Sequence, residues 1–164
     1  MRWLKDGKEV EDALRQGSEC ASTDDPLRHP GLERLTFDSV EFHSRTFLHF
    51  LRKLMEWSGD KSFQYAVLNP DPINYFFASF QRYPLIEIAV DDTADAYIAA
   101  LTEAPDASPA DAIGTNWSEY VIVPPSKQWC IHAKRDARSG EGGHLWVPQT
   151  WSDKVKEVYP YALH

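Results

Sequence analysis

The chain has 164 residues, of which 43% are hydrophobic and 13% aromatic, and this is enough for one domain of residues 1–164 with a single core. No apolar run approaches the roughly 20 residues that a membrane-spanning helix needs, and the start of the chain is too charged for a signal peptide. The net charge of −8 disfavours binding to the phosphates of nucleic acids.

Residues 1–35 are weakly patterned, and we expect a weakly ordered N-terminal segment. Residues 5–15 have the spacing of a short amphipathic helix, whereas residues 18–31 are polar and contain prolines and a glycine, which is typical of a loop. Cys20 lies in this loop, and Cys130 is the only other cysteine. A disulfide needs an export route that the sequence does not show, so we expect a reducing, cytoplasmic compartment.

The first well-patterned helix is predicted to begin at Asp38, where Glu41 three residues later completes a capping box. The helix is predicted to end near Gly59, and its apolar residues recur at helical spacing: Val40, Phe47, Phe50, Leu51 and Leu54. His43 and His49 are six residues apart and point to nearly opposite sides of this helix, so they cannot share a metal ion. His43 is expected in the core and His49 on the polar face.

Residues 62–68 alternate as a strand, and Asp71 with Pro72 then marks the start of a short helix. The aromatic face of this helix is interpreted as core rather than as a ligand site, and it consists of Ile73, Phe76, Phe77 and Phe80. Residues 85–90 are predicted to form a largely buried strand, in which Glu87 needs a partner or a solvent-facing position.

An acidic stretch follows, because no lysine or arginine occurs between Arg82 and Lys127. A helix is predicted from about Asp92 to Pro105, with Asp92 and Asp95 at the positive end of its dipole. The acidic residues proposed to bind a partner are Asp91, Asp92, Asp95, Glu103, Asp106 and Asp111. Such a surface attracts basic proteins, although acidic residues that only solubilise a helix and a loop are the alternative.

Three β-rich runs between Glu119 and Val147 are predicted to form a meander at the centre of the sheet. Strict alternation places Ile131 and Ala133 on the core face with Leu145 and Val147. The opposite face then carries Cys130, His132, His144 and Trp146 in any register, and it is the best candidate for a site. A last helix is predicted over residues 150–158.

The residue types on this face are those used in covalent catalysis and in metal binding. Cys130, His132 and Asp136 are a possible nucleophile, base and orienting group of a small hydrolase or transferase, but catalytic pairs usually come from different elements. Cys130, His132 and His144 are too few and too irregularly spaced to indicate zinc, so no metal is expected. The Gly-rich residues 138–143 lack the pattern of a phosphate-binding loop, and no cofactor is expected.

The residues Trp129-Cys-Ile-His-Ala-Lys-Arg-Asp136 contain the pattern Trp-x-Ile-x-x-x-Arg-Asp, and a strand with a tryptophan follows. This pattern resembles small uncharacterised bacterial proteins of the immunity-protein type, which neutralise toxins in competition between bacteria. The resemblance implies an antitoxin-like protein that acts by binding and has no catalytic set.

The sequence therefore favours a single α+β domain, with a mostly antiparallel sheet of about five strands packed by three to four helices. The leading hypothesis is a non-enzymatic acidic protein that binds a basic protein partner, possessing neither a metal nor a cofactor. Its binding residues are the six carboxylates above together with the face of His132, His144 and Trp146. The alternative is the small hydrolase or transferase.

Overall fold

The computed structural model describes residues 1–22, 31–37, 42–136 and 140–159. It has an α+β fold with one antiparallel sheet of seven strands. The strands are β1 (Arg2–Trp3), β2 (Leu32–Phe37), β3 (Ser62–Asn69), β4 (Leu85–Ala89), β5 (Glu119–Val123), β6 (Cys130–Asp136) and β7 (Gly140–Pro148). The α-helices are α1 (Gly7–Ala21), α2 (Arg45–Ser58), α3 (Ala78–Phe80), α4 (Ala94–Thr102) and α5 (Ser152–Val158).

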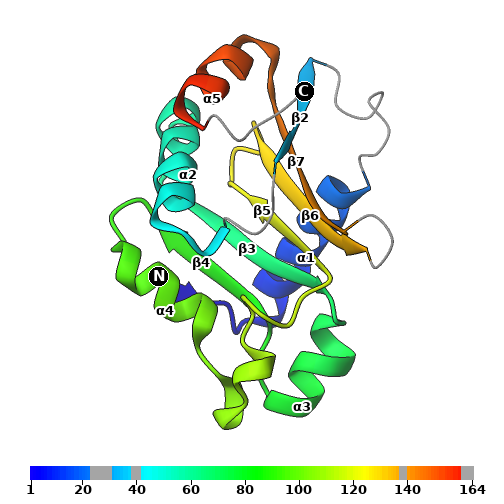
Figure 1. Ribbon diagram of the computed structural model, residues 1–164. Helices are drawn as coiled ribbons and strands as arrows, with labels where there is room; N and C mark the ends of the chain where they lie inside the picture. The colour runs from blue at the N-terminus through cyan, green and yellow to red at the C-terminus, as the bar shows by residue number, and fades with distance from the viewer. Residues whose placement is uncertain (23–30, 38–41, 137–139, 160–164) are drawn as a thin grey trace.

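The sheet lies between two layers of helices. Its strand order is β1-β4-β3-β5-β6-β7-β2, so the predicted meander β5-β6-β7 is confirmed and lies within the sheet. Helix α1 packs on one face, against β3, β5 and β6, while α2 and α4 lie on the other face (Figure 1). Because both faces are covered, the sheet contributes to two hydrophobic clusters rather than one.

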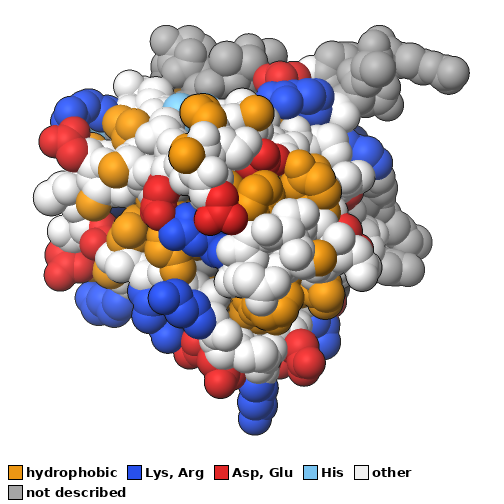
Figure 2. All heavy atoms as spheres, turned by 90° about the horizontal axis from the view of Figure 1, so that it is seen from below, with side chains coloured by type: hydrophobic (Ala, Val, Ile, Leu, Met, Phe, Trp, Pro, Cys, Tyr) orange, Lys and Arg blue, Asp and Glu red, His pale blue; other side chains and the backbone are white. Residues whose placement is uncertain are grey.

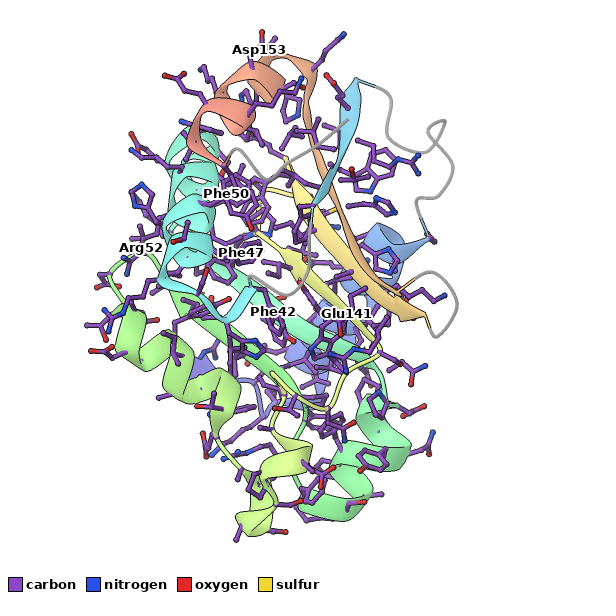
Figure 3. The ribbon with its side chains drawn as sticks, in the orientation of Figure 1. Phe42, Phe47, Phe50, Arg52, Glu141 and Asp153 are labelled. Atoms are coloured by element: carbon purple, nitrogen blue, oxygen red, sulfur yellow. A yellow bond between two sulfur atoms is a disulfide. The ribbon has the colours of Figure 1, made fainter. Side chains whose placement is uncertain are left out.

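The larger cluster forms between the sheet and α2. Phe47, Phe50, Leu51 and Leu54 are buried at the helical spacing that the sequence predicted. Figure 3 shows Phe47 and Phe50 between α2 and the sheet. On the sheet, Ile131 and Ala133 join Leu145 and Val147 in this cluster, which confirms the predicted core face of the meander. The apolar pattern of the sequence therefore predicts how α2 and the meander pack together on this side of the sheet.

The ends of α2 are only partly as predicted. Gly59 ends the helix in the left-handed conformation, with φ of 74°, as expected. The helix begins at Arg45, however, and the side chain of Ser44 caps it by accepting a hydrogen bond from the backbone N–H of Phe47 at 3.0 Å. The proposed capping box of Asp38 and Glu41 lies outside the described residues.

Helix α1 covers the second face of the sheet and corrects our expectation for the first 35 residues. The buried residues of α1 are Val10, Ala13, Gly17 and Cys20, which recur every three or four positions. Gly17 is needed for the close approach, because a Cβ atom there would lie 2.7 Å from Cγ2 of Val121. Since β1 and β2 also fall in this segment or at its end, the sheet has seven strands rather than about five.

The other predicted elements are present with shifted ends. Asp71 accepts hydrogen bonds from the backbone N–H groups of Ile73 and Asn74 and caps a helical segment of π-type turns, Pro72–Phe77, that continues into α3. Helix α4 begins after Thr93. The chain between α4 and β5 contains two short 3-10 turns, Pro105–Ala107 and Pro109–Asp111. The described chain has five α-helices where three to four were expected. The short helix predicted over residues 5–15 is present as part of α1, which continues to Ala21 through residues predicted as loop.

Glu87 is half-buried in β4, next to the edge strand β1. Burial raises the pKa of its carboxyl group, but hydrogen bonds from Arg2 and Ser62 outweigh this and leave the pKa below its ordinary value. The partner that the sequence required is therefore Arg2, at 2.7 Å. No helix within the described ranges has the length and the apolar composition needed to cross a membrane.

Candidate functional site

The predicted site face of the meander is brought together as expected but is mostly covered. Cys130 lies opposite Trp146, and His132 lies opposite His144, in the antiparallel register of β6 and β7. Cys130 and Trp146 are only 6% and 3% exposed, because α1 packs over them in the second hydrophobic cluster. At this end the candidate face is therefore buried under α1, and both sides of the sheet are core.

Cys130 is bonded to Cys20 at the end of α1, with 6.4 Å between the two Cα atoms. The expectation of two free thiols is therefore wrong. The two sulfurs meet because α1 crosses the sheet and places its last buried position over the start of β6. The sequence offered no signal for this pairing, since 110 residues separate the two cysteines.

The disulfide removes the group on which the enzyme alternative depends. A cysteine acts as a nucleophile only as a thiolate, and Cys130 has no thiol in this structure. Asp136 lies in β6, but its side chain is outside the described part of the chain. The small hollow beside the disulfide has a volume of about 50 Å³, and His132 is not among the residues that line it. This geometry does not support covalent catalysis at Cys130.

His132 forms a polar contact on this face with Glu119 at the start of β5. Its Nε2 lies 2.9 Å from Oε1 of Glu119, and because a carboxylate only accepts, Nε2 donates. This hydrogen bond lowers the pKa of Glu119 and outweighs the opposing effect of burial. With His132 7% exposed and Trp146 3% exposed, neither side chain offers surface to a partner, which corrects their predicted binding role. His144 is half-buried opposite them.

We expect the Glu119→Gln variant to be less stable than the wild type at neutral pH, because the amide loses the charged half of the pair with His132. The pKa of Glu119 is lower in the folded state, so its contribution is complete above the unfolded pKa and is lost as the pH falls through the folded value. The stability difference should therefore shrink below about pH 4. Urea unfolding at several pH values measures it, with Glu157→Gln on the exposed side of α5 as the control. A difference that stays constant with pH would contradict this assignment.

Metal binding has no support from the described residues. No group of three or more His, Cys, Asp or Glu side chains there is arranged to hold an ion. His49 is exposed on α2 as predicted, and His43 is half-buried before the helix, where its ring centre lies 3.9 Å from that of Phe42 with the ring planes tilted by 38°. Burial lowers the pKa of His43. Both histidines thus have structural positions that need no ligand.

The predicted acidic residues divide into two groups. Asp91, Asp92 and Asp95 lie at the start of α4, and Glu103, Asp106 and Asp111 lie between α4 and β5. Four of the six have partners within the molecule. Asp92 accepts from the amino group of Met1 and from the backbone N–H of Ala89, and Asp95 pairs with Arg45 at 2.5 Å.

Glu103 and Asp111 in the second group also have partners. Glu103 pairs with Arg82 at 2.6 Å. Asp111 accepts hydrogen bonds from Ser108 and from the hydroxyl of Tyr75, both at 2.6 Å, and these bonds lower the pKa of its carboxyl group. Asp91 and Asp106 are exposed and have no ion pair within the described residues. The sequence could not show these partners, because most of them lie far away along the chain.

Exposed apolar side chains accompany the second acidic group. Ile73 is 53% exposed and Tyr75 is 37% exposed, and Tyr75 is bonded to Asp111. Both follow Asp71 in the helical segment before α3, whose aromatic face was interpreted as core. Only Phe76 of that face is buried, so the interpretation was wrong for Ile73 and incomplete for Phe77 and Phe80, which are half-buried. Figure 2 shows this end of the molecule, with hydrophobic patches between acidic and basic side chains.

No family model, curated protein or solved structure matches this chain.

Proposed function

We propose that this chain is a non-enzymatic binding protein of the immunity or antitoxin type that docks a basic protein partner. The proposed contact consists of Ile73, Tyr75, Asp106 and Asp111. It is here called the α3 surface, because Ile73 and Tyr75 lie in the helical segment Pro72–Phe77 that continues into α3. The observation that carries this proposal is that Ile73 and Tyr75 are exposed in one helical segment and that the hydroxyl of Tyr75 donates to the carboxylate of Asp111. Exposed apolar residues that are rimmed by charge are typical of protein interfaces.

The two kinds of residue have different tasks in this proposal. Asp106 is exposed and unpaired within the described chain, so its charge is available to attract a cationic partner and to speed association. Tyr75 is held by Asp111 and Asn116, which limits the entropy that its ring loses on binding. A restrained aromatic ring at the centre of an interface commonly supplies much of the affinity. The net charge of −8 adds long-range attraction for a basic protein.

We expect Tyr75→Ala to weaken partner binding by about 30-fold, because a central aromatic residue typically contributes ~2 kcal/mol or more. Asp106→Lys should slow association by about ten-fold with a smaller effect on dissociation. The partner is first captured from the native cell with the wild-type protein, and the association and dissociation rates of the variants are then measured against it at two salt concentrations.

Two controls separate the α3 surface from general effects. Glu157→Lys changes the charge by the same amount as Asp106→Lys, but on α5. Tyr75→Phe keeps the ring and removes the hydroxyl that bonds Asp111. Equal binding by the wild type, Tyr75→Ala and Asp106→Lys, or a captured partner that is itself acidic, would refute the proposal.

A further inference from the structure

A groove opens at the edge of the sheet, between β1 and the C-terminal end of α3. Its volume is about 240 Å³, and its lining residues are Trp3, Leu4, Lys5, Phe77, Phe80, Gln81, Arg82 and Tyr83. It is separate from the α3 surface, since Ile73, Tyr75, Asp106 and Asp111 do not line it. No sequence pattern groups these residues, because only the fold brings the start of the chain beside residues 77–83.

Contacts with neighbouring side chains hold the aromatic residues that line the groove. Nε1 of Trp3 donates to Glu103 at 3.2 Å, and the guanidinium of Arg82 lies 4.2 Å from the centre of the indole ring. Phe77 and Tyr83 stack on each other with their ring centres 4.5 Å apart. Leu4 is 1% exposed and closes the floor. The groove therefore keeps its shape without a ligand.

The charges that line the groove are all positive. Lys5 and Arg82 are the only ionisable side chains in the lining other than the tyrosine hydroxyl, and no carboxylate is among them. Lys5 is exposed and has no ion pair within the described residues. Arg82 is paired with Glu103, but its Nη1 is buried and has no acceptor in the described part of the chain. Lys5 is therefore the cation that a ligand in the groove can reach.

We propose that this groove binds small aromatic carboxylates. An apolar cavity of about 150 Å³ is enough for benzene, so the groove has room for one ring and a short acidic side chain. The ring would pack between Trp3 and Phe77, where aromatic side chains favour offset or edge contacts. The carboxylate would lie toward Lys5 at the mouth of the groove, where the ammonium group is still hydrated and free to move.

Because the protein as a whole is negatively charged, a preference for a carboxylate would be specific to the groove. A chain with a net charge of −8 attracts cations and repels anions wherever binding is unspecific. A preference for the carboxylate over a cation of the same shape can therefore come only from the local charges of the groove. The proposal is independent of the basic protein partner, because it uses different residues.

The test compares three ligands with one ring and different charge: phenylacetate, phenylacetamide and 2-phenylethylamine. Binding is followed by the ¹H–¹⁵N signal of the Trp3 indole, which is assigned with the Trp3→Phe variant. We expect saturable binding of phenylacetate with a Kd on the order of 0.1–1 mM, as suits a ligand of this size. Phenylacetamide should bind about two- to five-fold more weakly, and the amine more weakly still.

Variants of Lys5 complete the test. Lys5→Gln should abolish the preference for phenylacetate over phenylacetamide, and Lys5→Glu should transfer the preference to the amine. Lys8→Gln is the matched control, since Lys8 is exposed in the first turn of α1 but does not line the groove. The proposal is overturned if no ligand saturates the Trp3 signal, if the amide or the amine binds the wild type as tightly as the carboxylate, or if Lys5→Gln and Lys8→Gln behave alike.

Discussion

Removing the disulfide between Cys20 and Cys130 is expected to lower the free energy of unfolding by about 4 kcal/mol, because the bond closes a loop of 110 residues. The loop contains α2, most of the sheet and α4, so the cross-link restricts most of the unfolded chain. Urea unfolding of the wild type with and without a reductant measures the effect, and the Cys20→Ala, Cys130→Ala double variant should match the reduced protein.

The single variants Cys20→Ala and Cys130→Ala separate the stability lost with side-chain packing from the stability lost with the cross-link. Both sulfurs are buried, at 4% and 6% exposure, so an alanine at either position also removes packing. Under reducing conditions each single variant therefore reports the packing loss alone. Equal unfolding midpoints for the oxidised and reduced wild type would contradict the expected effect. Two reactive thiols in protein purified without a reductant would show that the bond is not formed.

The Phe47→Ala variant is expected to lose about 4 kcal/mol of stability, as is typical when a fully buried phenylalanine is truncated. Phe47 is 0% exposed, and its ring centre lies 5.6 Å from Phe37 on β2 and 5.9 Å from Tyr159 after α5. Phe50 lies on the same helix at 6.0 Å. The cavity would thus loosen α2 from both the edge of the sheet and the C-terminal segment.

Two neighbouring substitutions test whether this loss comes from the cavity. Phe47→Leu retains most of the volume and should cost less than half as much as Phe47→Ala. His49→Ala lies on the exposed side of the same helix and should change the unfolding midpoint little. Thermal or urea unfolding compares the three variants. A Phe47→Ala variant as stable as His49→Ala would show that α2 does not pack on the sheet as described.

The disulfide also bears on the compartment in which the protein folds. The sequence offered a cytoplasmic location partly because two cysteines fit a reducing compartment. A buried disulfide between α1 and β6 is instead typical of proteins that fold under oxidising conditions. The comparison of oxidised and reduced protein therefore bears on the compartment as well as on stability.

The sequence by itself determined the elements whose apolar residues repeat at one period over a long stretch. Phe47, Phe50 and Leu54 defined the buried side of α2, and Ile131 with Leu145 defined one face of the meander. Local capping was also readable, at Asp71 and Gly59, because these signals depend on neighbours within a few residues. Helix α1 was underestimated because its buried stripe consists mainly of small residues, among them Ala13 and Gly17, which carry little apolar signal.

Only the tertiary structure decided which surfaces remain open, because this depends on pairs of residues that are distant in sequence. Helix α1 buries the face of Cys130 and Trp146, so the best candidate from the sequence became core. Arg45 and Arg82 neutralise Asp95 and Glu103 across 50 and 21 positions, which leaves fewer free carboxylates than the acidic stretch suggested. The groove beside Trp3 arises in the same way, because alternation and helical spacing describe single elements, whereas a pocket forms where separate elements meet.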